Sequence, residues 1–360
     1  MRTRCLSFHA AYRCRHSGEC CRAGWDIEVE PAVVEAVRSG RVRPQLSTPV
    51  PFVAGAGPAR PGGESRFALA RTTSGDCGFH HHARCSLQEA GTEALLPSAC
   101  RHFPRVFLRD ARGCLMTLSH FCPTAASLLL DGSEVSIVDA RPPLALEEPV
   151  EGLDARGALP PLVRPGMLAD TAGYAAWEEA VVQTFLKPAD AETALVSIDH
   201  ATERVRGWTP ADAPLSGLVA EAFAAPLAPA GRAPLSPAFA IVRELTGPHP
   251  LMEVPAGFGR GWDRIQRDAG DVLRGPVARY LAACAFGNWI AYRGQGLRTV
   301  AAWLRGCHDV LRVQLVRHLH DRRGGIDAAA LVYPIRMADY IMVHTVDSLA
   351  FGRTAIALER

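Results

Sequence analysis

The sequence predicts a mainly α-helical protein, in which an irregular, cysteine-rich N-terminal module packs on a C-terminal helical bundle. Nine of the eleven cysteines lie between residues 5 and 122. From about residue 168 onward, apolar residues recur at the spacing of an α-helix instead. This change of composition predicts a cysteine-cluster module over residues 1–139, a linker over 140–166 and a helical domain over 167–360.

The N-terminal part contains short elements separated by loops. Residues 31–40 read as a helix with Pro31 in its first turn, and residues 123–132 read as a second helix that begins with a proline. Residues 105–119 suggest a hairpin that turns near "DARG". Residues 42–65 are rich in proline and glycine, which predicts a long loop.

The C-terminal part shows helical periodicity with no repeat of fixed length. The helical stretches are residues 168–186, 190–206, 214–228, 235–246, 263–293, 297–322 and 326–350. In the last of them one stripe is predicted, made of Ile335, Ala338, Ile341, Met342, Thr345 and Leu349.

Composition excludes several classes of partner. The 360 residues carry a formal charge of +2 with acids and bases nearly balanced, so neither nucleic acid nor a membrane is an expected partner. The longest apolar stretch, residues 277–292, contains Arg279 and Asn288 and is shorter than the roughly 20 residues of a membrane span. The first ten residues do not resemble a secretory signal. We therefore expect a cytoplasmic protein with reduced thiols, and an odd number of cysteines also argues against a full set of disulfides.

The clustered cysteines predict a metal site. Thiolates select zinc or iron–sulfur clusters over hard cations. The spacings C-x₅-C-C and C-x₇-C match neither the paired knuckles of a zinc ribbon nor the tight run of a ferredoxin, so spacing leaves the metal open. The alternative is that the thiols are small buried hydrophobes, which suits Cys284 and Cys307. The predicted ligands are Cys14, Cys20, Cys21, Cys77, Cys85, Cys100 and Cys122.

The cysteine motifs also contain a pair of adjacent cysteines and several histidines. Adjacent Cys20 and Cys21 are not expected to point the same way. The three histidines at 80–82 suit a polar loop tip better than a ligand set. His102 and His120 lie close in sequence to Cys100 and Cys122, and would act as donors to sulfur.

Four segments appear in a characteristic order: "CRHSGECCRAGWDIEVE", "CGFHHHARCSLQEAG", "ACRHFPRVF" and "LSHFCPTAASLLL". Over roughly residues 12–130 they resemble the cysteine cluster of the flagellin lysine-N-methylase family, and more broadly the YkgJ-type zinc- or iron-chelating proteins. The resemblance implies a [4Fe–4S] cluster, with zinc as the alternative, and S-adenosylmethionine-dependent methyl transfer to lysine. It implies flagellin or another protein as substrate. The histidine-rich "GFHHHARC" departs from the family pattern, which leaves the substrate open.

The sequence assigns no catalytic or cofactor-binding residue. "AGAG" at 54–57 lies among prolines and does not form a dinucleotide-type loop, and the radical-enzyme motif C-x₃-C-x₂-C is absent. A lysine amine with a pKa near about 10.4 needs a base or a desolvating pocket before it can accept a methyl group. Two roles are predicted for Trp25 with equal weight: an aromatic wall over the cluster, or an ordinary core residue. The carboxylates near the motifs read as surface groups or helix caps; they are Glu28, Glu30, Asp76 and Glu89.

The rival hypothesis is a metal-binding protein without catalysis, either a carrier of iron or zinc or a structural adaptor. Both hypotheses share the metal, so only a test of chemistry separates them.

Overall fold

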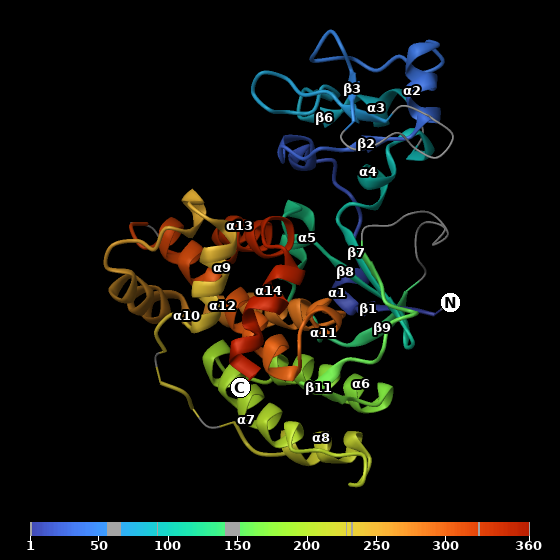
Figure 1. The fold of residues 1–360 in the computed structure, drawn as a ribbon. Coiled ribbons are helices and arrows are strands. Elements are labelled where there is room, and N and C mark those ends of the chain that lie inside the picture. The colour runs from blue at the N-terminus through green and yellow to red at the C-terminus, as the bar shows by residue number, and fades with distance from the viewer. Residues whose placement is uncertain are drawn as a thin grey trace.

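The computed structural model describes residues 2–55, 66–91, 93–140, 152–227, 229–231, 233–322 and 325–359. It is mainly α-helical, as the sequence predicts. Figure 1 shows a small module at the top, a sheet along one side and a body of helices beside and below it. In the described ranges, none of the helices combines the length and the apolar character that a bilayer crossing requires.

A five-stranded sheet connects the two ends of the molecule. Its strand order is β10-β7-β8-β1-β9. The predicted hairpin is confirmed as β7 (Arg105–Asp110) and β8 (Gly113–Leu118), paired antiparallel. The added strands are β1 (Thr3–Leu6), parallel to β8, β9 (Ile137–Ala140), antiparallel to β1, and β10 (Gly152–Asp154), parallel to β7.

Of the expected linker 140–166, residues 141–151 lie outside the described ranges, and residues 140 and 152–166 belong to the folded body rather than to a connection. Strand β10 pairs with β7, and β11 (Leu162–Arg164) pairs with β12 (Met167–Leu168). Strands of two or three residues are too short to show a periodicity of their own, so composition alone suggested a linker.

The part of the chain that we call the thiol module consists of the described residues between 14 and 102. Its elements are small: a three-stranded sheet in the order β2-β4-β3, a two-stranded hairpin β5-β6, and short helices. The expected loop at 42–65 contains strand β3, and its residues 56–65 lie outside the described ranges. The bounds are η1 (Glu19–Arg22), β2 (Glu28–Val29), α2 (Pro31–Arg38), β3 (Phe52–Ala54), β4 (Phe67–Leu69), β5 (His80–His81), β6 (Arg84–Cys85), α3 (Ser86–Ala90), η2 (Glu93–Leu95) and α4 (Ser98–His102).

The helical body follows the sequence prediction closely. The predicted stretch 263–293 breaks into two helices at Gly287, whose backbone has φ +63° and lies against Leu115 of β8. The helices are α6 (Thr171–Leu186), α7 (Ala191–Arg206), α8 (Leu215–Phe223), α9 (Pro237–Thr246), α10 (Phe258–Ala285), α11 (Ile290–Arg293), α12 (Leu297–Leu319), α13 (Val332–Asp339), the π-helix η5 (Tyr340–Thr345) and α14 (Ser348–Thr354). The chain also forms α1 (Ser7–Ala10) and α5 (Pro123–Leu128), the second of which starts at the predicted proline.

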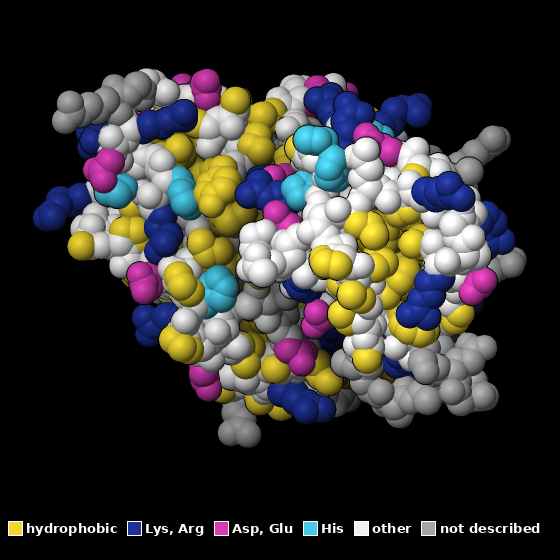
Figure 2. Space-filling view, turned by 90° about the horizontal axis from the view of Figure 1, so that it is seen from above, with side chains coloured by type: hydrophobic (Ala, Val, Ile, Leu, Met, Phe, Trp, Pro, Cys, Tyr) yellow, Lys and Arg dark blue, Asp and Glu magenta, His cyan; other side chains and the backbone are white. Residues whose placement is uncertain are grey.

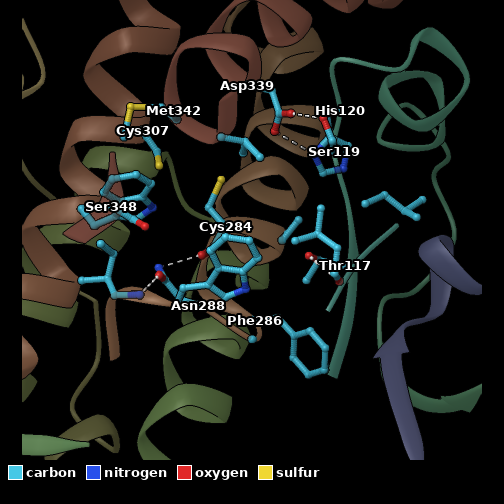
Figure 3. A pocket seen from close by; sticks show the side chains of 18 of the residues that line it. Thr117, Ser119, His120, Cys284, Phe286, Asn288, Cys307, Asp339, Met342 and Ser348 are labelled. Carbon is cyan, nitrogen blue, oxygen red and sulfur yellow. Dashed lines mark hydrogen bonds and ion pairs between the residues drawn. The ribbon is translucent and has the colours of Figure 1, made fainter. Parts of the chain in front are cut away.

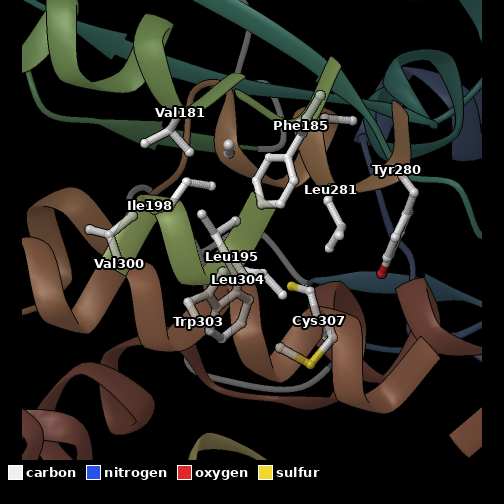
Figure 4. Packing of buried hydrophobic residues seen from close by; sticks show 14 of the residues in the cluster. Val181, Phe185, Leu195, Ile198, Tyr280, Leu281, Val300, Trp303, Leu304 and Cys307 are labelled. Atoms are coloured by element: carbon white, nitrogen blue, oxygen red, sulfur yellow. The ribbon is translucent and has the colours of Figure 1, made fainter. Parts of the chain in front are cut away.

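The main core forms around α12, which is buried along most of its length and packs against α7, α9, α10 and α13. Figure 4 shows Leu304 and Cys307 of this helix among apolar side chains from α6, α7 and α10. Leu6 and Leu115 of the sheet belong to the same buried cluster. Residues 1–139 are therefore divided: the thiol module has its own small core, whereas the sheet strands pack with the helical body.

A buried ion-pair network anchors the sheet to the helices. In the hairpin turn, Arg112 Nη2 lies 2.7 Å from Asp110 Oδ2, and its Nη1 lies 2.8 Å from Glu178 Oε1 on α6. Tyr292 donates to the same Asp110 oxygen at 2.8 Å, and the Gly287 N–H donates to Glu178 at 3.2 Å. The network joins the hairpin, α6 and the α10–α11 corner at one point.

Candidate functional site: a thiol-lined cavity

A cavity of about 760 Å³ lies where the thiol module meets the helical body. Its walls come from both parts: Trp25 and Gln88 belong to the module, while Ser119 and His344 belong to the body. Seen from the module's side, basic side chains gather beside histidines at one edge, and apolar side chains cover a broad area nearby (Figure 2). All of the predicted ligands line this one cavity: Cys14, Cys20, Cys21, Cys77, Cys85, Cys100 and Cys122.

Four of these thiols form one group: Cys20, Cys21, Cys77 and Cys85. The 3₁₀ turn η1 carries the first two, and the hairpin β5-β6 carries Cys85. The Cys77 N–H donates to the Cys21 carbonyl at 2.7 Å, which joins the two segments. Gly18 permits their close approach, because a Cβ at this position would lie 2.6 Å from the Ala83 carbonyl oxygen.

Hydrogen bonds among these four thiols determine their acidity. The pKa of Cys21 is raised far above its usual range because its thiol is hydrogen-bonded to Cys20, Cys77 and Cys85. The same bonds lower the pKa of Cys20 and of Cys77. They lower the pKa of Cys85 to about 7, with help from backbone N–H groups at the start of α3. The group therefore contains thiols that lose protons easily, as metal ligands must.

The adjacent cysteines do not point apart, so the expectation that they would is wrong. Both line the cavity, and their thiols bond to each other. Cys100 of α4 lies beside the same group: burial raises the pKa of its thiol, and repulsion from the thiolate forms of Cys77, Cys20 and Cys85 raises it further.

A second, smaller group contains Cys14 and Cys122. The Tyr12 hydroxyl lies 3.7 Å from Cys122 Sγ, and the His16 N–H donates to Cys14 Sγ at 3.4 Å. Burial raises the pKa of Cys122, whereas the N–H groups of Ala125 and Thr124 at the start of α5 lower it. The predicted ligands thus divide into five thiols on the module and a pair between the module and the sheet.

The donor chemistry fits a soft metal, although the thiols do not converge on one point. In the part of the chain that the structure describes, no three Cys, His, Asp or Glu side chains form a group able to hold a metal ion. A single zinc ion needs its four sulfur ligands at about 2.3 Å from a common centre. What the cavity offers is a set of thiols from four chain segments facing the same space, and thiolate is the type of donor that zinc and iron–sulfur clusters share.

The histidines of the motifs lie elsewhere. His81 and His82 form the tip of the β5-β6 hairpin, where His82 has a positive φ of 48°. His120 turns away from Cys122: its Nε2 lies 3.2 Å from His9 Nε2, and its Nδ1 lies 3.5 Å from Asp339 Oδ1. The predicted role of His120 as a donor to sulfur is therefore wrong. His102 is buried, and its ring centroid lies 6.3 Å from that of Phe107.

Trp25 is part of the cavity wall. Its ring centroid lies 4.6 Å from that of His344 and 5.1 Å from that of Phe103. The ring is half-buried, and through its contact with His344 it bridges the thiol module and the helical body. None of the four carboxylates considered above belongs to the described lining of the cavity. Asp76, for example, lies 3.9 Å from Arg22, and Glu30 accepts from the Ser98 N–H at 3.0 Å.

A polar cluster at the floor of the cavity was not anticipated. Ser119 Oγ donates to Asp339 Oδ2 at 2.8 Å and lies 2.7 Å from His344 Nε2. Asp339 and His344 are five residues apart, and the π-helix that begins at Tyr340 brings positions i and i+5 onto one face. Sequence periodicity does not reveal a π-helix, and Ser119 is 220 residues from Asp339. Burial lowers the pKa of His344, although Asp339 opposes this effect.

A narrow hollow of about 110 Å³ adjoins the cavity and is shown in Figure 3. Ser119 and Val106 line both spaces. Cys284 and Cys307 also face the hollow. Burial is the main cause that raises the pKa of Cys307, and a hydrogen bond to Cys284 raises it further. These two cysteines are close to each other, which their separation in sequence did not indicate.

Comparison of the chain with protein-family models, with curated proteins and with solved structures found no match. The class of protein is thus defined by the fold and the site. It is a mainly α-helical protein with a small thiol module, and its seven motif cysteines line one cavity against the helical body.

Proposed function

We propose that the protein is an iron–sulfur enzyme that transfers a methyl group from S-adenosylmethionine to the amine of a protein lysine. Flagellin is the expected acceptor, on the basis of the motif resemblance. The observation that carries the proposal is the position of the seven cysteines, which come from separate segments and line one cavity.

The roles of the cavity residues follow from their chemistry. Cys20, Cys21, Cys77 and Cys85 would hold the cluster, with Cys100 beside them. A bound cluster supplies one-electron redox chemistry, at a potential that hydrogen bonds to sulfur and solvent exposure adjust. The cavity volume of about 760 Å³ is within the range of small-molecule sites, so a methyl donor has room beside the thiols. Arg13 in the wall would supply positive charge for the carboxylate of a methionine-derived donor, whereas Arg71 is already paired with Asp26 at 3.0 Å.

A structural zinc site without catalysis is the second candidate. The thiol module has only two- and three-stranded sheets and helices of eight residues or fewer among its described elements. Small cores of this kind often need a metal as a staple. The close contact of four thiols is compatible with that role.

The two candidates are separated by metal content and by activity. Protein purified without oxygen should be brown, contain iron and bleach on reduction. Cys85→Ser should remove the colour, and the matched control Cys284→Ser should keep it because Cys284 lies in the other space. Labelled S-adenosylmethionine should then label lysines of purified flagellin.

Three outcomes would count against the enzyme. Colourless protein with one equivalent of zinc and no transfer would support the structural site. Brown protein that transfers no label to flagellin or to lysate proteins would leave an iron–sulfur protein without this activity. Folded protein that binds neither metal would exclude both candidates.

A further inference from the structure

The hollow beside the thiol cavity combines an apolar wall with one buried carboxylate. Figure 3 shows Phe286, Cys284 and Met342 around it, with Asp339, Ser119 and His120 at one side. The lining also includes the indole rings of Trp289 and Trp303. Its volume of about 110 Å³ is several times the 10–15 Å³ or so that holds one water. The space is therefore suited to a short aliphatic chain.

Asp339 has no lysine or arginine partner among the described lining of this hollow, and its Oδ1 lies 3.5 Å from His120 Nδ1. It is 2% exposed, and it accepts from the Ser119 hydroxyl at 2.8 Å and from the Phe121 N–H at 3.0 Å. Among the described residues that line the hollow there is no lysine or arginine. Arg336 lies on the same helix but binds the Phe121 carbonyl and Glu19. A buried carboxylate is costly unless it is paired with a cation, and a histidine supplies a charge only when it is protonated, so the site favours a ligand that brings a positive charge of its own.

We propose that this hollow binds the side chain of the acceptor lysine. The four methylenes would lie along Trp289, Ile290 and Met342, and the ammonium would bind Asp339 next to Ser119. Aromatic faces near a bound cation add attraction. The proposal rests on the proposed function for the identity of the acceptor, but binding of the amine requires neither the methyl donor nor the metal.

The shared wall explains how the amine would meet the donor. Because Ser119 and Val106 line both spaces, a nitrogen held at Ser119 faces the thiol-lined cavity. In the lysine complex the Ser119 hydroxyl turns from Asp339 to His344 Nε2, which lies 2.7 Å from Ser119 Oγ, so that it gives its proton to this nitrogen and takes one from the ammonium. The neutral amine then attacks the methyl carbon: the C–N bond forms, the S–CH₃ bond breaks, and the sulfonium becomes a thioether.

Amine binding can be measured on the full-length protein without a methyl donor. The probes are n-butylammonium and two peptides that differ only in lysine or norleucine, and tryptophan fluorescence reports binding because two indoles line the hollow. We expect saturable binding of the lysine peptide and weaker binding of the norleucine peptide. Asp339→Asn should weaken lysine-peptide binding at least tenfold, whereas Asp347→Asn, an exposed carboxylate that caps α14, should not change it.

A second pair of variants avoids the buried carboxylate. Val343 lines the hollow and is 40% exposed, so Val343→Trp should block the hollow without disturbing the core. Leu349→Trp, at a site 41% exposed outside the lining, is its control. Equal binding of the two peptides, or unchanged binding by both Asp339→Asn and Val343→Trp, would overturn the proposal. If the protein binds the lysine peptide selectively but transfers no methyl group, the proposed lysine site is supported and only the proposed methyltransferase activity is contradicted.

Discussion

The thiol module and the helical body are stabilised in different ways. The body is built around α12, with large aromatic and aliphatic side chains from many helices in one continuous cluster. The buried cluster of the module is smaller and consists of valines, leucines, one alanine and the two phenylalanines Phe52 and Phe79. The body buries enough apolar surface for a stable core of its own. In the module, which is much smaller, partly buried cysteines pack against the small core where a larger domain would have further apolar side chains. The difference leads us to predict that the stability of the module depends on the metal proposed for its thiols.

If the thiol module holds the proposed metal, removing that metal should have a larger effect than any single substitution, and it should affect only the module. A structural metal contributes apparent free energies on the order of 10 kcal/mol, more than any single side-chain contact. Chelation without oxygen should therefore abolish hydrogen-exchange protection of amides in β3 and β4, while amides of α12 keep theirs. Mass spectrometry of peptides after exchange measures the protection of the β3 and β4 amides and of the α12 amides in one experiment. Equal loss in the two regions, or no loss in either, would contradict the comparison.

Breaking the buried anchor of the sheet should destabilise the body. Arg112→Met leaves Asp110 and Glu178 buried without their cation, which costs about 3–5 kcal/mol of the free energy of unfolding. Urea unfolding followed by circular dichroism measures this loss.

The chain contains a matched control for this variant. Asp154 and Arg156 repeat the Asp-x-Arg pattern at the surface, with side chains 47% and 56% exposed, against 0% and 5% for Asp110 and Arg112. Arg156→Met should have little effect on the free energy of unfolding, because water and salt screen an exposed ion pair. A cost for Arg112→Met no larger than that of its control would show that the anchor contributes little.

A single methyl group should disturb the thiol group. Gly18→Ala places a Cβ 2.6 Å from the Ala83 carbonyl oxygen at a φ of +73°, which separates the turn of Cys20 and Cys21 from the hairpin of Cys85. Strain of this kind costs about 1–3 kcal/mol, so metal affinity should fall roughly tenfold or more in competition with a chelator. Gly75→Ala has a similar φ of +86° with nothing within 4 Å, and it should leave the affinity nearly unchanged. Equal effects of the two variants would mean that the close approach at Gly18 is unimportant for the site.

The sequence by itself determined the helical elements and the set of cysteines. Helices such as α6 and α7 carry their apolar periodicity and their capping aspartates within a few residues, so their bounds could be predicted. The cysteine motifs likewise selected the residues that line the cavity, because the information lies in the residue type itself. The hairpin 105–119 was predictable for the same reason, since its turn and strands are contiguous.

Only the tertiary structure decided which of these residues meet. The short strands β1, β9 and β10 form only by pairing with distant partners, so they left no local signal. The division of the cysteines into a four-thiol group, its neighbour Cys100 and the pair of Cys14 and Cys122 follows from the packing of η1 on the β5-β6 hairpin. The cluster of Ser119, Asp339 and His344 needs both a π-helix and a contact across more than 200 residues. Contacts of this kind depend on the free energy of the whole fold, which no window of sequence contains.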